Sequence, residues 1–509
     1  MSSSIVRAGT RACLSAASLL VVLSGTAFAQ PAPEDFVDWL RPRVWVGDEE
    51  PRYSLEDQMA RYQVPGVAVA IIDDGEVVFA SGFGVRQAGG DDPVDADTVF
   101  SVGSVSKVAT ASLVLALSND GVLDLDAPVA SQLTSWTLPD HPDYDEERIT
   151  LRAILSHTAG FNMHGFRDFQ PGADLPSAID TLNGQSPAIN DPLELLFQPG
   201  TAYKYSGGGY TLAQQIIDDT DASADFDTIA ETRLLAPLGM TRSRFTNPLP
   251  PQHGNIAMAH NRSGEPVALP RGYQAMPERA ASGLWTSASD LAALVAALLN
   301  SYKSEGGFLP RDVARDMMTP VSPSEHGLGP RIEARGHDFI FHHGGANDSY
   351  HAWIEGHGAS GDGLVILTNS RSGNELIPEI RNAVADTMGW QANQPIRLPE
   401  TTLAEEDLAS FEGSYRVDSE FPYAFRRQMT RRFFDLGIEV KAEEGRLLMT
   451  FEGDDGGILL VPMTPNRFWI EGFGLTMGIA ELEFHRNAHG ETEAVTFHLS
   501  NASSHYVRN

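Results

Sequence analysis

Residues Ser101-Val102-Gly103-Ser104-Val105-Ser106-Lys107 decide how the rest of this chain is interpreted. Ser104 and Lys107 are three positions apart, so a helix that begins at Ser104 places both side chains on one face, one turn apart. A serine hydroxyl becomes an effective nucleophile when a neighbouring base removes its proton. Lysine is such a base in its neutral form, which burial favours.

The segment after this stretch supplies the burial. Residues from Val105 to Leu117 leave almost no polar face, which is typical of a helix inside a protein. Asn119-Asp120-Gly121 then ends the predicted helix. A lone Ser-x-x-Lys pair also fits a helix N-terminus with a solvated lysine, so the choice between the two depends on other motifs.

Two later stretches supply those motifs. Tyr205-x-Gly207 lies in a turn-rich loop before a predicted helix, and His343-Gly344-Gly345 ends a predicted strand that starts at Asp338. With Ser104-x-x-Lys107, their order and rough spacing resemble the serine beta-lactamase-like family, which includes class C beta-lactamases, D-alanyl-D-alanine carboxypeptidases, D-aminopeptidases and related esterases. The resemblance covers roughly residues 50 to 390. Supporting stretches are Leu155 to Gly160, Leu238-Gly239-Met240, and Ser282 to Leu291.

The resemblance implies an α+β fold of the beta-lactamase/transpeptidase type, with an antiparallel sheet flanked by helices and a helical subdomain. Residues 67–72 and 77–84 are predicted strands joined at Asp73-Asp74-Gly75, a hairpin signal. Residues 122–200 are expected to form the helical part that frames the cleft. Ser287-x-x-Asp290 is a capping-box pattern that opens a predicted helix.

The resemblance also assigns roles. Ser104 attacks a carbonyl to form an acyl-enzyme, and Lys107 and Tyr205 share the proton transfers; the sequence leaves open which is the base. Backbone N–H groups of Ser104 and Ala346 would hold the oxyanion. His343 would support Tyr205 or hold a leaving or carboxylate group. No cofactor is needed.

Two positions depart from the commonest family pattern. Gly207 stands where an asparagine is common, and His343 stands where the lactamases have lysine. Glycine has no amide side chain to offer a substrate, and histidine is a weaker cation than lysine. Gly344 and Gly345 would let substrate lie close against the strand. We therefore expect better turnover of esters or D-aminoacyl substrates than of beta-lactams.

Histidines occur in two places outside these motifs. His326, His337, His342, His343, His351 and His357 form a histidine-rich window. No His-Glu-x-x-His spacing is present, and neighbours on a strand point to opposite faces, so we expect no metal site. His157 is interpreted as a hydrogen-bonded structural residue rather than a catalytic one.

Length and charge limit the classes of function. A chain of 509 residues with 42% apolar residues suggests two or three globular domains. Its net charge of -32 argues against nucleic acids and anionic membranes as partners. The expected partner is a small ester, amide or peptide substrate; the oligomeric state cannot be inferred.

Residues 1–29 are interpreted as a signal peptide. Arg7 and Arg11 precede an apolar core from Ala12 to Leu23, and Ala27-Phe28-Ala29 has a small-x-small cleavage pattern. A membrane anchor is the alternative, but the apolar core is short for a span. The single cysteine, Cys13, would be removed with this segment. We expect a secreted or periplasmic protein without stable membrane insertion.

The pattern changes after the hydrolase-like domain, residues 30–392. Pro395 and Pro399 bracket a predicted linker, residues 393–402. Residues 403–509 contain short alternating runs typical of half-buried antiparallel strands, and are predicted to form a small all-β, barrel-like accessory domain. Phe411 to Tyr415 resembles the start of the lipocalin-like domain of some family members.

Three functions are compatible with these residues. The first is a secreted serine hydrolase that acts through Ser104 on small esters or D-amino-acid amides and peptides. The second is a penicillin-binding, receptor-like protein that is acylated and turns over slowly. The third is a ligand-binding protein that acts through its C-terminal barrel. Ser104, Lys107 and Tyr205 together favour the first.

Overall fold

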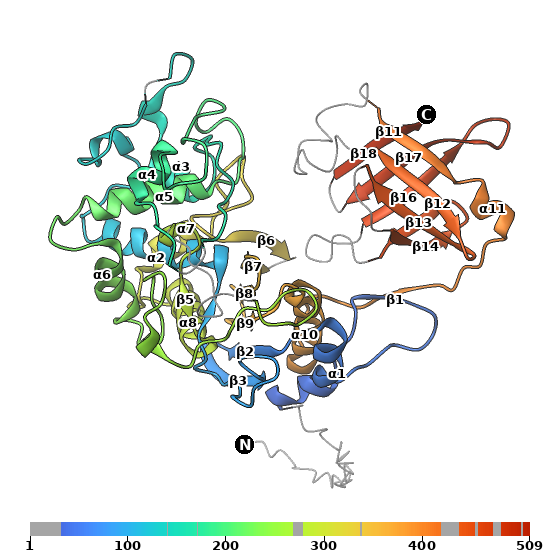
Figure 1. Cartoon of the computed structure of the whole chain (residues 1–509), viewed down its shortest axis with the longest axis horizontal. Helices are drawn as coiled ribbons and strands as arrows, with labels where there is room; N and C mark the ends of the chain where they lie inside the picture. The colour runs from blue at the N-terminus through green and yellow to red at the C-terminus, as the bar shows by residue number, and fades with distance from the viewer. Residues whose placement is uncertain are drawn as a thin grey trace, which may run out of the picture.

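The structure is a computed structural model that describes residues 32–139, 141–169, 172–267, 278–335, 338–418, 437–452, 457–471, 480–499 and 502–509. These residues form a large part built from helices and a sheet, followed by a closed β-barrel (Figure 1). The predicted α+β fold with an all-β, barrel-like C-terminal domain is confirmed. The predicted signal peptide and His337 lie outside the described residues.

A six-stranded antiparallel sheet with the order β3-β2-β9-β8-β7-β6 forms the centre of the large part. The predicted hairpin is confirmed, because β2 and β3 join at Asp74 and Gly75, whose φ angles of 46° and 80° suit a tight hairpin turn. The strands are β2 (Gly66–Asp73), β3 (Glu76–Gly84), β6 (Arg331–Arg335), β7 (Asp338–Ala346), β8 (His351–His357) and β9 (Gly363–Thr368).

Helices cover both faces of this sheet, which is why β2 is apolar on both sides up to Asp73. Ala68 and Ala70 face the core that holds α2, α5 and α8, whereas Val67 and Val69 face the core that holds α1 and α10. The α-helices of this part are α1 (Leu55–Tyr62), α2 (Ser106–Asn119), α3 (Leu151–Leu155), α4 (Ala178–Asn183), α5 (Gly207–Asp218), α6 (Phe226–Ala230), α7 (Arg279–Ser282), α8 (Ala288–Lys303), α9 (Arg311–Met317) and α10 (Gly373–Met388).

Single helical turns and a small two-stranded sheet complete this part. β4 (Phe100–Ser101) pairs with β5 (Trp285–Thr286) and leads into the Ser104 segment. The predicted cap of α8 is confirmed, since Ser287 Oγ accepts a hydrogen bond from Asp290 N at 3.2 Å. The short turns are η1 (Pro33–Asp38), η2 (Gly103–Val105), η3 (Val129–Ser131), η4 (Glu146–Arg148), η5 (Glu231–Leu235) and η6 (Pro251–His253).

The C-terminal part is an antiparallel barrel of eight strands. Described apolar side chains pack inside it, and the rings of Phe411, Phe468 and Phe484 lie 4.5–5.5 Å apart between centroids. A short helix, α11 (Glu405–Ala409), precedes the barrel. The strands are β11 (Gly413–Val417), β12 (Ile438–Glu443), β13 (Arg446–Phe451), β14 (Ile458–Thr464), β15 (Arg467–Ile470), β16 (Ala480–Arg486), β17 (Thr492–Leu499) and β18 (Ala502–Arg508).

A short parallel pair of strands connects the two parts of the chain. β1 (Val44–Val46) pairs with β10 (Ile396–Leu398). Val44 and Leu398 pack against Trp469 of the barrel. The predicted linker, residues 393–402, is therefore partly structured, and its boundaries remain a prediction.

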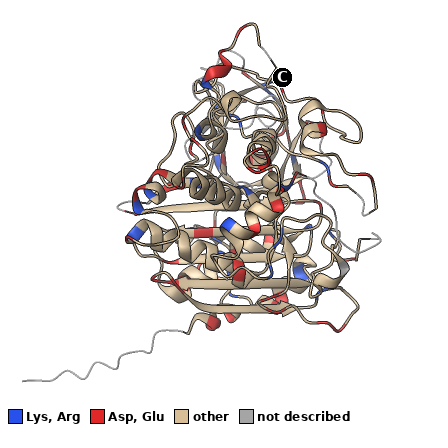
Figure 2. Ribbon diagram, turned by 90° about the vertical axis from the view of Figure 1, so that its left-hand side faces the viewer, with Lys and Arg blue, Asp and Glu red and all other residues tan. Residues whose placement is uncertain are grey.

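Acidic residues outnumber basic ones, in keeping with the net charge of -32. Figure 2 shows Asp and Glu along helices and loops in many parts of the ribbon. Among the described residues, no helix is long and apolar enough to cross a membrane.

Candidate active site

Ser104 lies in the single 3-10 turn η2, directly before α2. Ser106 holds this turn, because its Oγ donates to the Gly103 carbonyl at 2.6 Å and accepts from Leu284 N at 2.9 Å. Gly103 has a φ of 48°, and a Cβ there would come within 2.9 Å of Ala346 N. The nucleophile turn therefore packs directly on the end of β7, and only glycine fits at this contact.

Lys107 is in the first turn of α2 and is 2% exposed. Its Nζ donates to Ser104 Oγ at 3.2 Å and to the Ala281 carbonyl at 2.7 Å. Within the described residues no carboxylate forms an ion pair with it, and burial lowers its pKa to about 7. A large fraction of the Lys107 amine is therefore neutral near pH 7, as a general base requires.

Tyr205 also contacts Ser104. Its hydroxyl is hydrogen-bonded to Ser104, and burial nevertheless raises its pKa to about 12. Lys107 Nζ lies 5.0 Å from the centroid of the Tyr205 ring. Ser104 Oγ thus has one neighbour that loses its proton near neutrality and one that keeps it.

Four histidines surround the Tyr205 ring. Centroid distances from Tyr205 are 4.2 Å to His157, 5.0 Å to His164, 6.0 Å to His326 and 6.2 Å to His343. Burial is the largest cause that lowers the pKa of each of them. Tyr205 is therefore packed among neutral imidazoles, which add no positive charge beside Lys107.

The sequence interpretation did not place His157 beside Tyr205. Its Nδ1 accepts a hydrogen bond from Ser206 N at 3.1 Å, so it holds the start of α5 next to Tyr205. Its Nε2 is buried and has no partner within the described part of the chain. The stretch from Leu155 to Gly160 was the available signal, but a motif of this length does not show which ring it contacts.

His342 and His343 point to opposite faces of β7, as expected. His342 stacks on Trp353 at 5.0 Å between centroids. Nδ1–H of His343 donates to the Gly344 carbonyl at 2.7 Å, which leaves Nε2 as its acceptor nitrogen. Across the described residues no group of three or more His, Cys, Asp or Glu is arranged to hold a metal ion.

Gly207, Gly344 and Gly345 have different surroundings. A Cβ at Gly345 would overlap the Val102 carbonyl oxygen, so this position accommodates the nucleophile turn rather than substrate. Gly344 is exposed, and a Cβ there would lie 3.4 Å from the Trp353 ring, on the face of β7 that also carries His342. A Cβ at Gly207 would lie 2.9 Å from the Phe166 ring and 3.1 Å from the His164 carbonyl, so an amide side chain does not fit there without rearrangement.

Ala346 ends β7 beside Gly103. Asn347 Nδ2 donates to Ser101 Oγ at 2.9 Å and so ties the end of this strand to β4. The backbone of Ala346 and the Ser104 turn are thereby held against each other, as the predicted oxyanion site requires.

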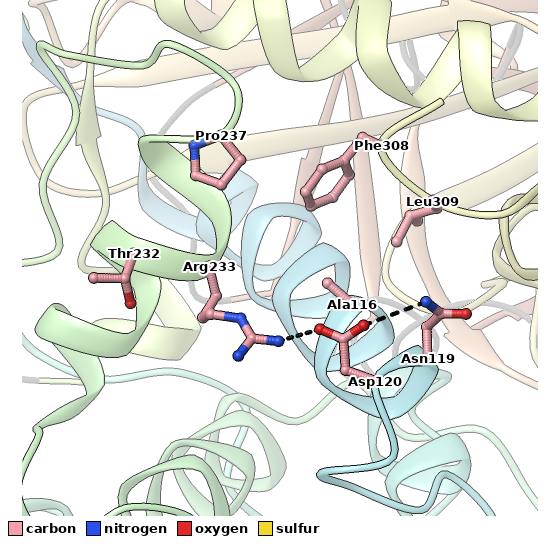
Figure 3. A pocket seen from close by; sticks show the side chains of 8 residues that line it. All are labelled: Ala116, Asn119, Asp120, Thr232, Arg233, Pro237, Phe308 and Leu309. Atoms are coloured by element: carbon pink, nitrogen blue, oxygen red, sulfur yellow. Dashed lines mark hydrogen bonds and ion pairs between the residues drawn. The ribbon is translucent and has the colours of Figure 1, made fainter. Parts of the chain in front are cut away.

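A cavity of about 260 Å³ lies at the C-terminal end of α2, the end remote from Ser104 (Figure 3). Asp120 and Arg233 form an ion pair in its wall. Its lining contains no serine or histidine. The cavity is therefore separate from the nucleophile cluster.

Comparison with known proteins supports the interpretation of this cluster. The Beta-lactamase family model matches residues 54–388, which contain all of the motifs described above. The chain belongs to the beta-lactamase family. Because the match ends before the barrel, the family assignment concerns the large part of the chain.

Relatives within the beta-lactamase family have several names. The chain is 28% identical to D-aminopeptidase of Gluconobacter oxydans, over 56% of this chain and 52% of that protein. It is 29% identical to Esterase EstB of Burkholderia gladioli, over 54% of this chain and 75% of that protein. The chain spans only 49–63% of the length of several of its curated relatives.

A solved structure has the same fold. The octameric penicillin-binding protein homologue from Pyrococcus abyssi superposes with a TM-score of 0.56 at 22% identity, over 89% of this chain and 98% of that one. At this identity the likeness concerns the fold.

Proposed function

We propose that this protein is a secreted serine hydrolase that forms an acyl-enzyme on Ser104 and acts on small esters or D-amino-acid amides and peptides. The observation that carries the proposal is the position of Ser104 Oγ, 3.2 Å from Lys107 Nζ and hydrogen-bonded to the hydroxyl of Tyr205. A nucleophile between a depressed-pKa amine and a protonated phenol has both a proton acceptor and a proton donor within reach.

In the proposed acylation, neutral Lys107 takes the proton of Ser104 as Oγ bonds to the substrate carbonyl carbon. The carbonyl oxygen becomes an oxyanion, held by the backbone N–H groups of Ser104 and Ala346. When the bond to the leaving group breaks, Tyr205 gives that group a proton and recovers one from Lys107. Water then attacks the acyl-enzyme by the reverse sequence. These assignments make Lys107 the base, because its pKa of about 7 suits the task better than that of Tyr205.

The surroundings of the site favour esters and aminoacyl substrates over beta-lactams. Gly207 offers no side-chain amide, and the space beside it is closed by Phe166. His343 is neutral because burial holds its pKa well below the usual value, so it attracts an anionic substrate less than a lysine does. Relatives are named D-aminopeptidase and Esterase EstB, but also Beta-lactamase, so the preference is proposed from the site and not from these names.

The two alternatives have less support. Slow turnover after acylation depends on how water reaches the acyl-enzyme, and it is tested by kinetics below. Ligand binding inside the barrel is disfavoured by the aromatic side chains that fill the described interior. Secretion rests on residues 1–29 alone.

The test combines labelling with turnover. We expect a fluorophosphonate to label the protein without residues 1–29, and Ser104→Ala to abolish the labelling because no second serine has a buried amine beside it in the described part of the chain. Values of kcat/KM are compared for p-nitrophenyl acetate, D-alanine p-nitroanilide and nitrocefin. Undiminished labelling of Ser104→Ala would refute the nucleophile. Nitrocefin as the preferred substrate would overturn the substrate class, and a burst without turnover would favour the penicillin-binding alternative.

A further inference from the structure

Three carboxylates lie on segments that contact the nucleophile cluster. Glu278 immediately precedes α7, whose Ala281 carbonyl accepts the hydrogen bond of Lys107 Nζ. Asp168 follows His164, whose ring lies 5.0 Å from that of Tyr205. Asp348 comes two residues after Ala346, at the end of β7.

These acidic residues are also close to one another. Asp348 N lies 3.5 Å from Asp168 Oδ2, and the charge of Asp168 acts on Glu278. Three separate segments therefore bring acidic side chains near one another. Among the described residues, none of the three carboxylates takes part in an ion pair.

Glu278 is the least expected member of this group. It is 2% exposed, and its Oε2 has no hydrogen-bond partner in the described part of the chain. Burying a carboxylate without a partner is unfavourable, and proteins that do so either protonate the group or supply a cation. α7 is held in place by other contacts: Thr110 Oγ1 donates to the Ala280 carbonyl at 2.9 Å, and the Gln214 side chain accepts from Ala280 N at 3.2 Å. The Glu278 side chain also has a hydrogen bond with its own backbone, which leaves Oε2 without a partner and not required to fix α7.

The pKa values of these groups are those of carboxylates without a cation beside them. Burial, and then the neighbouring Asp168, raise the pKa of Glu278 to about 8. Burial, and then Asp348, raise the pKa of Asp168 to about 7. A bound cation would favour the ionised forms of both and would form charge-assisted hydrogen bonds with them.

We infer that Glu278 and Asp168 bind the protonated amine of an aminoacyl group whose carbonyl is attacked by Ser104. An α-amino nitrogen is one carbon away from the reacting carbonyl, and the segments that carry Glu278 and Asp168 contact Lys107 and Tyr205 through Ala281 and His164. An acyl group with hydrogen in place of the amine would leave them without a partner. This inference rests on the proposed function and gives preference, among its substrates, to those with a free amine beside the scissile bond.

The test uses substrates that differ only in that amine. The p-nitrobenzyl esters of alanine, in both enantiomers, are compared with the p-nitrobenzyl ester of propionic acid, and p-nitrobenzyl alcohol is measured by chromatography. We expect the wild-type kcat/KM to favour one alanine ester by ~10-fold or more, as a hydrogen bond between charged groups would provide. In Glu278→Gln this ratio should fall by ~10-fold. Asp168→Asn, at a half-buried position, should lower it in the same direction and serves if Glu278→Gln does not fold.

Glu379 provides a matched control on the other face of the sheet. It is a buried carboxylate with a raised pKa, but its oxygens accept from Gln58 Nε2 at 2.6 Å and from the Tyr62 hydroxyl at 2.8 Å. Glu379→Gln should leave the alanine-to-propionate ratio as in wild type. Two results would overturn the amine site while the hydrolase proposal stands. The first is a wild-type enzyme whose kcat/KM for the alanine esters is no higher than for the propionate ester. The second is an alanine-to-propionate ratio of kcat/KM that is unchanged in both Glu278→Gln and Asp168→Asn. Turnover of neither ester, with no fluorophosphonate label, would overturn both.

Discussion

Lys107 and Arg381 are both buried basic residues, but they lie on opposite faces of the six-stranded sheet and have different surroundings. Arg381, on α10, is 7% exposed and donates through Nε to Glu355 at 2.8 Å. Its guanidinium also lies 4.2 Å from the centroid of the Trp353 ring. Lys107 has a hydroxyl and a carbonyl as its hydrogen-bond acceptors, and no described carboxylate pairs with it.

The difference in partners decides what each residue does. Burial acts to raise the pKa of Glu355, but the charge of Arg381, together with hydrogen bonds from His357 and Trp353, outweighs it and holds that pKa far below the usual range. Both members of this pair are therefore charged, and their role is structural. Lys107 lacks such a partner, so its pKa falls and the amine becomes available for proton transfer. A buried basic residue without a carboxylate partner thus marks the candidate active site.

Replacing Lys107 should have the largest effect on the rate. Lys107→Met keeps the apolar stem and removes the amine, and we expect kcat/KM on p-nitrophenyl acetate to fall by ~10²–10⁴-fold. Thermal stability should be at or above that of wild type, because an amine that is costly to bury has been removed. Lys303→Met, at a surface lysine paired with Asp74, is the control and should keep the wild-type rate. Unchanged turnover in Lys107→Met, or failure to fold, would contradict the comparison.

Replacing Arg381 should have the opposite result. Arg381→Met leaves Glu355 buried without its cation, and we expect a loss of ~3–5 kcal/mol in the free energy of unfolding. Measured on the folded fraction, KM for p-nitrophenyl acetate should stay near wild type, because the pair lies on the far face of the sheet. Urea denaturation followed by circular dichroism measures the first quantity. A loss below ~1 kcal/mol would show that the pair does little for stability.

The pH dependence should be the smallest effect and the most specific. Lys107 must be unprotonated to act as base, so kcat/KM for p-nitrophenyl acetate should fall ~tenfold per pH unit below its pKa of about 7 and level off above it. Burial keeps His343 neutral across this range, so His343→Gln should show the same fall of kcat/KM below pH 7 even if its rate is lower. A flat profile of kcat/KM from pH 5 to 8 would contradict the role given to Lys107. If the fall below pH 7 disappears in His343→Gln, the titrating base is the histidine.

Local signals predicted the parts of the fold that depend on neighbouring residues. The Asp74-Gly75 turn, the cap at Ser287 and the opposite orientations of His342 and His343 all follow from short-range geometry. The pairing of β1 with β10 was not predictable, because each strand has three residues and its partner is about 350 residues away. The role expected for Gly345 was wrong in part, since the sequence does not show that the Val102 carbonyl occupies the adjacent space.

The candidate site was predictable where motifs mark it and not where tertiary contacts create it. Ser104, Lys107 and Tyr205 were found from spacing and resemblance, and the structure brings them together. Glu278 and Asp168 lie in no recognised motif, and their proximity depends on how separate loops pack. The same holds for the Glu355–Arg381 pair, whose members lie on a strand and on a later helix.

The register of β2 with β9 has a consequence for how the protein becomes active. Val67 pairs with Thr368, so the central sheet joins segments roughly 300 residues apart. Contacts this distant in sequence form late, because the entropy of closing the intervening chain must be overcome first. The turn that presents Ser104 is completed only when β7 packs against Gly103. Catalytic competence should therefore appear as a late event in refolding, after most of the helical signal has returned.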